Sequence, residues 1–330
     1  MKRQLFAGIA LAAAGALALA GCSNGGGSDE AGGEASGDSY KIGISQLVQH
    51  PALDAATEGF QQAFADAGVE VEFDLQNANG EQATAVTIAQ SFASEDLDLV
   101  LAVATPAAQA VAQAVTDIPV VFTAVTDAVE AELVDSNEAP GGNLTGTSDA
   151  APIGEQLALL KEIVPDAAKV GIVYASGEVN SQVQVDAVTE VAPEYDLEIV
   201  TQTVTTANDI QQATEALGDV DAIYVPTDNM VVSGLASLAQ VAEAKKIPVI
   251  GAEAGTVETG AVATLGIDYT KLGYQTGEMA LAILQDGADP ATMPVETAKE
   301  FSYVVNTGAA ERMGATIPQD ILDQADTVGE

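Results

Sequence analysis

Several acidic and hydroxyl side chains in this sequence directly follow apolar runs. If these runs are strands of a parallel sheet, their ends bring such side chains together at one edge of the sheet. Asp127, Asp228 and Glu253 follow such runs, and a carboxylate at a strand end can pair with a cationic amine. Thr105 is followed by Pro106, a combination favoured at the start of a helix. The free N–H groups and positive dipole end of a helix start can hold an anion. One site with both features would suit a zwitterion such as an amino acid.

Further polar side chains stand at comparable positions. Several of the candidates also have a purely structural interpretation as a helix cap, a helix-entry residue or a core residue. Thr105 and Asp228 can be helix caps, for example, and Tyr174 can belong to a core. Their shared placement at strand ends is what favours a binding site. These further candidates are Gln46, His50, Ser148, Tyr174 and Asn229.

Charge and residue counts exclude several kinds of chemistry. Ten basic and 49 acidic residues give a formal charge of −39, a field that repels nucleic-acid phosphates and disfavours anionic lipid. With one His and one Cys, neither a zinc site of Cys and His ligands nor a disulfide within the chain can form. We expect no metal, no cofactor and no enzymatic activity, because only His50 could activate a nucleophile and no Gly-x-Ser-x-Gly motif is present. Composition alone leaves a paired-carboxylate hydrolase open.

Arginine is nearly absent, which limits how an anionic group can be bound. Arg3 and Arg312 are the two arginines, and neither follows a predicted strand. A bidentate arginine clamp for a carboxylate or phosphate is therefore not expected. The anionic end of a ligand would depend on helix starts and hydroxyl groups such as that of Thr105.

Alternating strands and helices are needed to position these residues. Apolar runs predict strands, and amphipathic segments between them, such as Pro51–Ala67 and Val231–Ala244, predict helices. The strands form two groups of four, separated by Asp127–Ala151 with its turn signal Pro140-Gly141-Gly142-Asn143. The predicted strands are Lys41–Val48, Val69–Leu75, Leu97–Ala104, Ile118–Val125, Lys169–Ala175, Leu197–Val204, Val220–Val225 and Ile247–Gly251.

This order predicts an α/β protein with two lobes, each a doubly wound parallel sheet, joined by hinge strands. The tail adds a strand at Ala261–Asp268, a helix at Tyr269–Gln285 and a strand at Glu296–Asn306, which we expect to cross between the lobes. We assign residues 40–147 plus 261–292 to the first lobe and 148–260 plus 293–330 to the second. Such lobes close around a ligand in the cleft between them.

The N-terminus has the pattern of an exported lipoprotein. Lys2 and Arg3 precede an uncharged apolar run of about 16 residues, too short to span a membrane, which predicts a signal peptide over residues 1–21. It ends in Leu19-Ala20-Gly21-Cys22, which resembles a bacterial lipobox with Cys22 as the lipidated residue. Residues 22–39 are rich in Gly, Ser and acids and predict a flexible tether. We expect anchoring to the outer face of the cell membrane.

Two segments carry most of a family resemblance: His50-Pro51-Ala52-Leu53-Asp54 and Pro226-Thr227-Asp228-Asn229. Across nearly all of Tyr40–Pro318 the chain resembles the ABC-transporter substrate-binding proteins of the tryptophan/tyrosine type, with the type I periplasmic-binding-protein fold. The resemblance implies a monomer that captures a small solute, often an aromatic amino acid, and delivers it to an ABC permease. It also places the strand-end candidates in the cleft and adds Asn180, in Glu178-Val179-Asn180-Ser181.

Within this fold the sequence leaves two other functions open. The protein can be a sensor that docks on a signalling receptor, or an ABC receptor for a sugar or nucleoside. A sugar or nucleoside has no ammonium group for Asp228, and the absence of Trp disfavours a sugar site. Our hypothesis is that Thr105 and nearby amides hold the ligand carboxylate, that Asp228 pairs with the amine, and that His50 and Tyr174 line the side-chain pocket.

Overall fold

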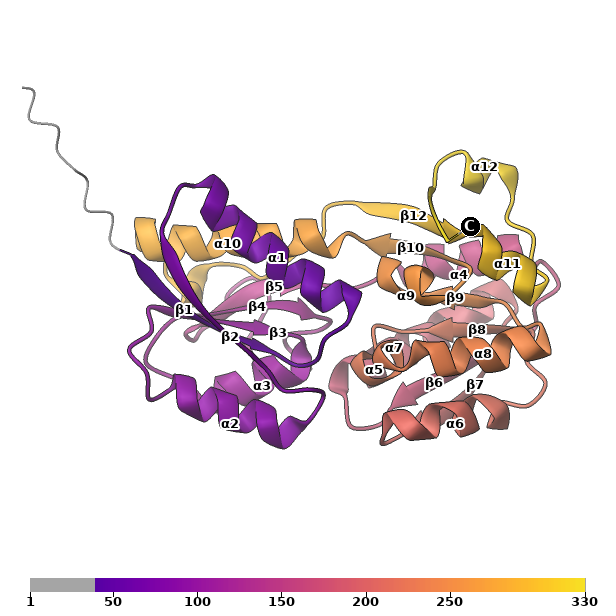
Figure 1. The fold of residues 1–330 in the computed structure, drawn as a ribbon, viewed down its shortest axis with the longest axis horizontal. Helices are drawn as coiled ribbons and strands as arrows, with labels where there is room; N and C mark the ends of the chain where they lie inside the picture. The colour runs from indigo at the N-terminus through magenta and orange to yellow at the C-terminus, as the bar shows by residue number, and fades with distance from the viewer. Residues whose placement is uncertain (1–38, 330) are drawn as a thin grey trace, which may run out of the picture. The chain divides into compact units, whose positions relative to one another are not determined.

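Residues 39–329 form two α/β lobes in the computed structural model of the chain (Figure 1). The sheet of the first lobe has the strand order β11-β5-β4-β3-β1-β2, and that of the second β13-β12-β10-β9-β8-β6-β7. Neighbouring strands are parallel except β10 and β12, which pair antiparallel. The predicted fold class of two parallel-sheet lobes is therefore confirmed.

The first lobe combines the start of the chain with one late helix and one late strand. Its strands β3 and β4 are buried along their whole length, as expected for parallel strands covered on both faces. The strands are β1 (Tyr40–Gln46), β2 (Val71–Asn77), β3 (Leu99–Val103), β4 (Val120–Val125), β5 (Leu144–Ser148) and β11 (Glu296–Thr297). The helices are α1 (Pro51–Asp66), α2 (Gln82–Phe92), α3 (Thr105–Ala114) and α10 (Tyr269–Asp286), with a 3-10 turn at Pro290–Thr292.

The second lobe has its own hydrophobic core around β6, β8 and β9. Its strands are β6 (Lys169–Ala175), β7 (Glu198–Val204), β8 (Ala222–Val225), β9 (Val249–Gly251), β10 (Ala263–Ile267), β12 (Phe301–Asn306) and β13 (Asp326–Val328). Its helices are α4 (Ile153–Ile163), α5 (Val179–Val191), α6 (Ile210–Ala216), α7 (Asn229–Ser233), α8 (Leu235–Lys245), α9 (Ala254–Thr259), α11 (Thr307–Met313) and α12 (Gln319–Leu322), with 3-10 turns at Ala192–Tyr195 and Ala207–Asp209.

The chain passes between the lobes after β5, after β10 and after β11. Two strands belong to a different lobe from the one that the predicted boundaries assign them to. Strand β10, within the range assigned to the first lobe, pairs in the second sheet, because its residues pack into the second core. Strand β11, assigned to the second lobe, pairs with β5 in the first sheet. Strand β5 itself lies in the stretch predicted to be a connection. Each crossing therefore lies at the end of a strand.

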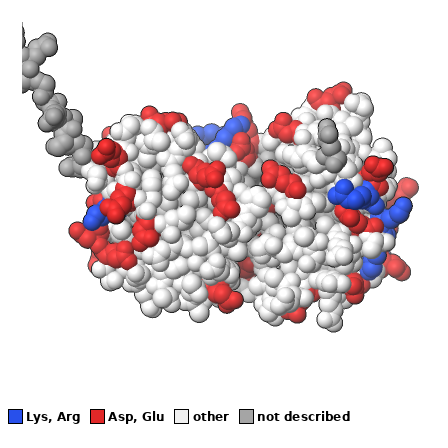
Figure 2. Space-filling view, viewed as in Figure 1, with Lys and Arg blue, Asp and Glu red and all other residues white. Residues whose placement is uncertain are grey.

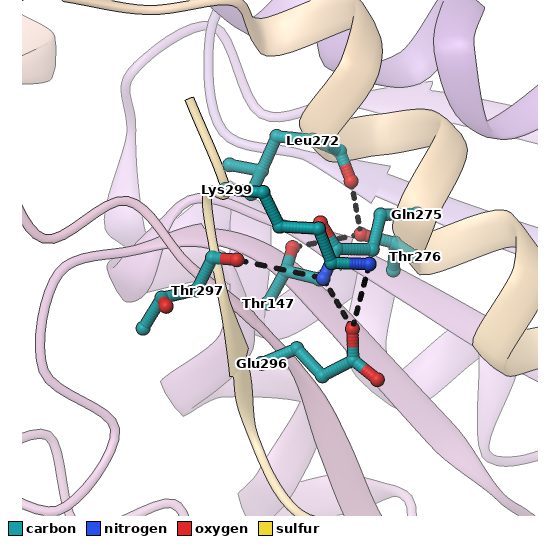
Figure 3. A network of polar contacts seen from close by, with 7 residues as sticks. All are labelled: Thr147, Leu272, Gln275, Thr276, Glu296, Thr297 and Lys299. Atoms are coloured by element: carbon teal, nitrogen blue, oxygen red, sulfur yellow. Dashed lines mark hydrogen bonds and ion pairs between the residues drawn. The ribbon is translucent and has the colours of Figure 1, made fainter. Parts of the chain in front are cut away.

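The crossing that follows β11 is fastened to the first lobe by polar contacts (Figure 3). Gln275 of α10 donates from Nε2 to the carboxylate of Glu296, and Lys299 Nζ lies 3.9 Å from that same carboxylate. The hydroxyls of Thr147 and Thr276 lie 2.8 Å apart and join β5 to α10. Strand β5, helix α10 and strand β11 thus form one connected support beside the crossing.

Glycines bring α1 and α10 into close contact. A Cβ atom at Gly273 would overlap the carbonyl oxygen of Ala56, and one at Gly59 would overlap the carbonyl oxygen of Thr270. Only glycine permits such an approach of two helix backbones. Helix α1 begins directly after His50, and α10 begins at Tyr269, so this pair of helices fixes the positions of two residues of the site described below.

Acidic side chains lie over both lobes on the face seen in Figure 2, with far fewer basic ones. No helix within residues 39–329 is long and apolar enough to cross a membrane. The predicted signal peptide, Cys22 and the tether up to residue 38 lie outside the described residues. The predictions for that segment therefore stay predictions.

Candidate ligand-binding site

A small pocket of about 10 Å³ lies between loops of the two lobes. His50, at the entry to α1, reaches it from the first lobe. Four other sequence candidates reach it from the second lobe, and two residues at the crossings complete its charged and aromatic lining. These are Asn180, Asp228, Asn229 and Glu253 from the second lobe, and Asp149 and Tyr269 at the crossings.

Asp228 is fully buried at the start of α7 and acts as its N-cap. Its Oδ1 accepts a hydrogen bond from the Val231 backbone N–H at 2.8 Å, and its Oδ2 accepts one from the Ala175 N–H at 2.5 Å. Burial raises the pKa of this carboxyl group. The capping role that the sequence allowed is therefore present. Because each carboxylate oxygen has two lone pairs, capping leaves acceptor capacity on the pocket side.

Glu253 is the N-cap of α9 and is 1% exposed. Its Oε2 accepts the Gly255 backbone N–H at 2.6 Å. Its Oε1 is buried and has no hydrogen-bond partner within residues 39–329. Burial raises the pKa of Glu253 to about 7, because the charged form loses its hydration. A donor placed in the pocket would satisfy this oxygen.

His50 connects the two lobes across the pocket. Its Nε2 lies 3.5 Å from Oδ1 of Asn229, while its Nδ1 is buried without a partner in the described part of the chain. Burial lowers the pKa of His50 to about 4, so the imidazole is neutral at neutral pH. A second contact between the lobes joins the hydroxyls of Thr126 and Thr227 at 3.3 Å.

Asn180 contributes an amide whose two ends have different surroundings. Its Nδ2 donates to the Thr227 carbonyl oxygen at 2.9 Å and to Oε2 of Glu178 at 3.1 Å. Its Oδ1 is buried and has no partner among residues 39–329. The pocket therefore contains a second oxygen that can accept a hydrogen bond from a ligand.

Asp149 and Tyr269 lie at two of the crossings, and the candidate list lacked both. Tyr269 donates its hydroxyl to Asp149 Oδ2 at 2.6 Å, and Asp149 Oδ1 accepts from Thr126 Oγ1 at 2.9 Å. Burial raises the pKa of Asp149, and burial beside this carboxylate raises that of Tyr269. Asp149 directly follows the candidate Ser148, and Tyr269 is the first residue of the predicted helix Tyr269–Gln285, so these positions were the available signal.

Thr105 lies outside the pocket lining, at the start of α3. It was predicted to cap this helix, but the helix begins at Thr105 itself, and the preceding residue, Ala104, makes the turn with a φ of 82°. The Thr105 hydroxyl is buried and has no partner within residues 39–329. A positive φ at an alanine costs conformational energy, and such strain is common beside functional sites.

The other four candidates also lie outside the pocket lining, and local contacts occupy their polar groups. Gln46 bonds to Asp54 and Thr57. Asp127 accepts hydrogen bonds from the Val129 and Glu130 N–H groups. Ser148 donates its hydroxyl to the Thr126 carbonyl oxygen, and Tyr174 donates its hydroxyl to Gln182. No group of His, Cys, Asp and Glu within residues 39–329 is arranged to hold a metal ion.

Comparison with known proteins places this arrangement in a family. The model of the family "ABC transporter substrate binding protein" matches residues 41–329. The tyrosine-binding protein of Clostridioides difficile (strain R20291) is 44% identical over 296 residues, which cover 87% of this chain and 86% of that protein.

Two crystal structures of relatives each cover 88% of this chain and 99% of the other. An ABC domain from Streptococcus pneumonia in complex with L-Trp is 36% identical, with a TM-score of 0.84. The ligand-free, open structure of a substrate-binding protein from Clostridium difficile is 43% identical, with a TM-score of 0.68. With a family model matching almost the whole described chain, this protein belongs to the ABC transporter substrate-binding proteins.

Proposed function

We propose that this ABC substrate-binding protein captures an amino acid with an aromatic side chain in the pocket between its lobes. The observation that carries the proposal is the lining of this pocket, to which both lobes contribute. The second lobe provides the buried carboxylate of Glu253, one oxygen of which lacks a partner in the described chain, and the first lobe provides a neutral His50. The relatives named for tyrosine and solved with L-Trp support the aromatic class. Proteins of this family bind solutes, so the function is capture rather than catalysis.

The amine of the ligand is bound by the carboxylates of the second lobe. Glu253 and Asp228 both line the pocket, and a ligand ammonium provides an opposite charge to both and a hydrogen bond to the Glu253 oxygen that lacks a partner within residues 39–329. The same ammonium lies within reach of His50 from the first lobe. A ligand that contacts both lobes stabilises the closed arrangement, because these contacts are not available when the lobes separate. The higher TM-score to the L-Trp complex than to the open relative supports such closure.

The ligand carboxylate is bound near the start of α3. The Thr105 hydroxyl is buried without a partner in the described chain, and the start of a helix favours an anion through its dipole and its free N–H groups. Arg312, the one arginine within residues 39–329, instead lies 2.6 Å from the carboxylate of Glu243. Helix start and hydroxyl therefore take the place of an arginine clamp.

A groove of mixed polar and apolar lining beside this helix start accommodates the aromatic side chain. Its volume is about 290 Å³, and its apolar residues Leu47 and Pro106 of the first lobe face Val204 and Met230 of the second. An aromatic ring placed here removes apolar area from water on both sides, at about 25 cal/mol per Å². The groove joins the two lobes, so the ring would add to the closure.

Export, anchoring and delivery complete the proposal. A signal peptide over residues 1–21 and lipidation of Cys22 would hold the folded part, as a monomer, outside the cell membrane on the tether. An ABC permease would then receive the solute. Metabolic labelling with a palmitate analogue tests the anchor, since Cys22 is the one cysteine and Cys22→Ser must abolish the label.

Isothermal titration calorimetry with a panel of solutes tests the ligand class. The panel contains L-tyrosine, L-tryptophan, L-phenylalanine, their deaminated and decarboxylated analogues, a hexose and a nucleoside. Binding confined to the intact aromatic amino acids supports the proposal, and binding of the hexose or nucleoside alone overturns it. Asp228→Asn should weaken L-tyrosine binding by about 2–5 kcal/mol, as for other buried charge pairs.

A matched pair of variants tests the carboxylate site. Thr105→Val removes a hydroxyl that has no partner within the described chain and keeps the side-chain shape, so stability should be preserved while affinity falls about tenfold. Thr116→Val, at an exposed threonine just after α3, serves as the control and should change neither. Equal affinities of both variants for L-tyrosine would exclude Thr105 from the site.

A further inference from the structure

Glu178 is a buried carboxylate outside the lining of the pocket that contains His50, and it lines the neighbouring groove at the start of α3. It precedes α5 and faces the start of α7, where several N–H donors converge on it. Its Oε2 accepts from Asn229 Nδ2 at 2.6 Å, from the Asn229 backbone N–H at 3.2 Å and from Asn180 Nδ2 at 3.1 Å. Its Oε1 accepts from the Met230 N–H at 3.1 Å. One carboxylate thus holds two side-chain amides and the first turn of a helix.

These contacts decide which way each amide points. An amide that donates its Nδ2 to Glu178 must present its Oδ1 on the other side, because reversing it would set two oxygens against each other. Asn229 accordingly directs Oδ1 toward His50 Nε2. Since Oδ1 can only accept, the imidazole carries its hydrogen on Nε2 and leaves Nδ1 as a bare acceptor. In the same way, Asn180 presents Oδ1 as an acceptor.

The result is a set of three buried acceptor atoms in one pocket. His50 Nδ1, Asn180 Oδ1 and Glu253 Oε1 all belong to lining residues, and none has a partner within residues 39–329. A primary ammonium group carries three N–H donors, which matches this set in number and kind. An amide turned the other way would replace an acceptor by a donor and repel the ammonium.

We propose that Glu178 is a positioning residue that orients Asn180 and Asn229, and through Asn229 the imidazole of His50, so that the pocket accepts a primary ammonium. The part of this proposal that concerns the ammonium rests on the proposed function. The part that concerns the imidazole does not, because it describes the protein before any ligand binds.

Protonation of Glu178 does not reverse this arrangement. Burial, with Asp228 nearby, raises the pKa of Glu178 to about 7, so a proton is bound in part of the molecules at neutral pH. Three N–H groups already point at Oε2 and only one at Oε1, so the proton is carried on Oε1. Oε2, which orients both amides, remains an acceptor in either state.

Nuclear magnetic resonance of the one histidine tests the orientation in the full chain without ligand. The ¹⁵N shifts of the two ring nitrogens report the tautomer, and with a single His no assignment is needed. The wild type should show the limiting shifts of the Nε2–H form. Glu178→Met, which has no acceptor oxygen at this position, should show averaged shifts, whereas Glu162→Met, at an exposed position on α4, should match the wild type. A wild-type Nδ1–H tautomer, or unchanged shifts in Glu178→Met, overturns the proposal.

A second variant covers the case in which Glu178→Met does not fold. Asn229→Ala keeps the backbone N–H contacts of Glu178 and removes the amide that holds His50. It should also give averaged histidine shifts. Wild-type shifts in Asn229→Ala overturn the proposal, because the amide would then have no part in fixing the imidazole.

Affinity ratios test the selectivity for the ammonium. Kd is measured for L-tyrosine and for 3-(4-hydroxyphenyl)propionate, which lacks only the amine. The preference for L-tyrosine should fall by about tenfold in Glu178→Met and stay unchanged in Glu162→Met. An equal loss for both compounds would mean a merely structural role and overturn the proposal. If the wild type binds neither compound, the proposed function fails, while the histidine shifts still decide the positioning role.

Discussion

Replacing Glu253 by Gln should make the protein more stable above neutral pH and at the same time weaken ligand binding. Glu253 is 1% exposed, and its charged form has lost its hydration while one oxygen gains no hydrogen bond within the described chain. The glutamine side chain keeps an oxygen for the Gly255 N–H and cannot ionise. The variant therefore removes the cost of a buried charge and loses the group that would pair with an amine.

The size and the sign of this effect follow from the pKa. Burial raises the pKa of Glu253 from its ordinary value of 4.5 to about 7. The folded state thus holds this proton more tightly than the unfolded chain does. The stabilising contribution of the neutral form is complete below pH 4.5 and is lost as the pH rises through 7. At about 1.4 kcal/mol per pH unit, the loss amounts to about 3 kcal/mol above pH 7.

Urea denaturation at pH 4.5 and at pH 8 measures this difference. Between the two pH values, the free energy of unfolding of Glu253→Gln should fall by about 3 kcal/mol less than that of the wild type. Glu190→Gln, at an exposed position on α5, is the control and should follow the wild-type profile. Parallel profiles for wild type and Glu253→Gln would refute the reasoning, because the carboxyl group would then titrate normally. Calorimetry at pH 8 should show weaker binding of L-tyrosine by the variant.

Three further predictions concern other buried groups. Gly273→Ala should destabilise the protein by about 3 kcal/mol in urea denaturation, because its Cβ would overlap the Ala56 carbonyl. The control Gly154→Ala in α4, whose Cβ meets only the Tyr195 hydroxyl at 3.5 Å, should be neutral or stabilising. Equal effects of the two variants would contradict the close contact between α1 and α10. Tyr224→Phe should lower the free energy of unfolding by about 1–3 kcal/mol in the same assay, since it leaves the buried Gln156 Oε1 without its 2.6 Å hydrogen bond. The affinity for L-tyrosine should not change, and a changed affinity would place Tyr224 in the site. Burial lowers the pKa of His50 to about 4, so the wild type loses stability as the pH falls from 6.5 to 4. Over this range, the free energy of unfolding of His50→Gln should fall by about 3 kcal/mol less than that of the wild type. An equal loss in both proteins would mean that His50 titrates normally.

Much of the architecture was predictable because apolar runs and their spacing are strong local signals. The strand Lys169–Ala175 has the predicted bounds, and the order of strands and helices gave the two lobes. Strand β5, Leu144–Ser148, was missed because Thr, Gly and Ser interrupt its apolar pattern. The helix predicted at Val231–Ala244 is two helices, since the chain breaks at Gly234, where a Cβ would meet the side chain of Ile210.

The site was predictable only in part, because placement at a strand end does not determine where a side chain points. Placement at a strand end selected Asp228 and Glu253, which do line the pocket. The same rule selected Asp127, whose carboxylate instead caps its own turn. The contribution of Glu178 depends on contacts with residues about 50 positions later, a distance at which no local pattern reports a partner. Long-range contacts of this kind become visible only in the folded chain.

The close contact between α1 and α10 also has a consequence for the order in which the molecule can fold. The first lobe lacks one of the helices that cover its core until Tyr269–Asp286 has been made, although its strands β1 to β5 come first. The strands β6 to β10 of the second lobe, in contrast, lie in one continuous stretch. Contacts between distant segments form slowly, since a long loop must close first. The apolar strand β4, which contacts α10, therefore lacks part of its cover until this late helix has been made.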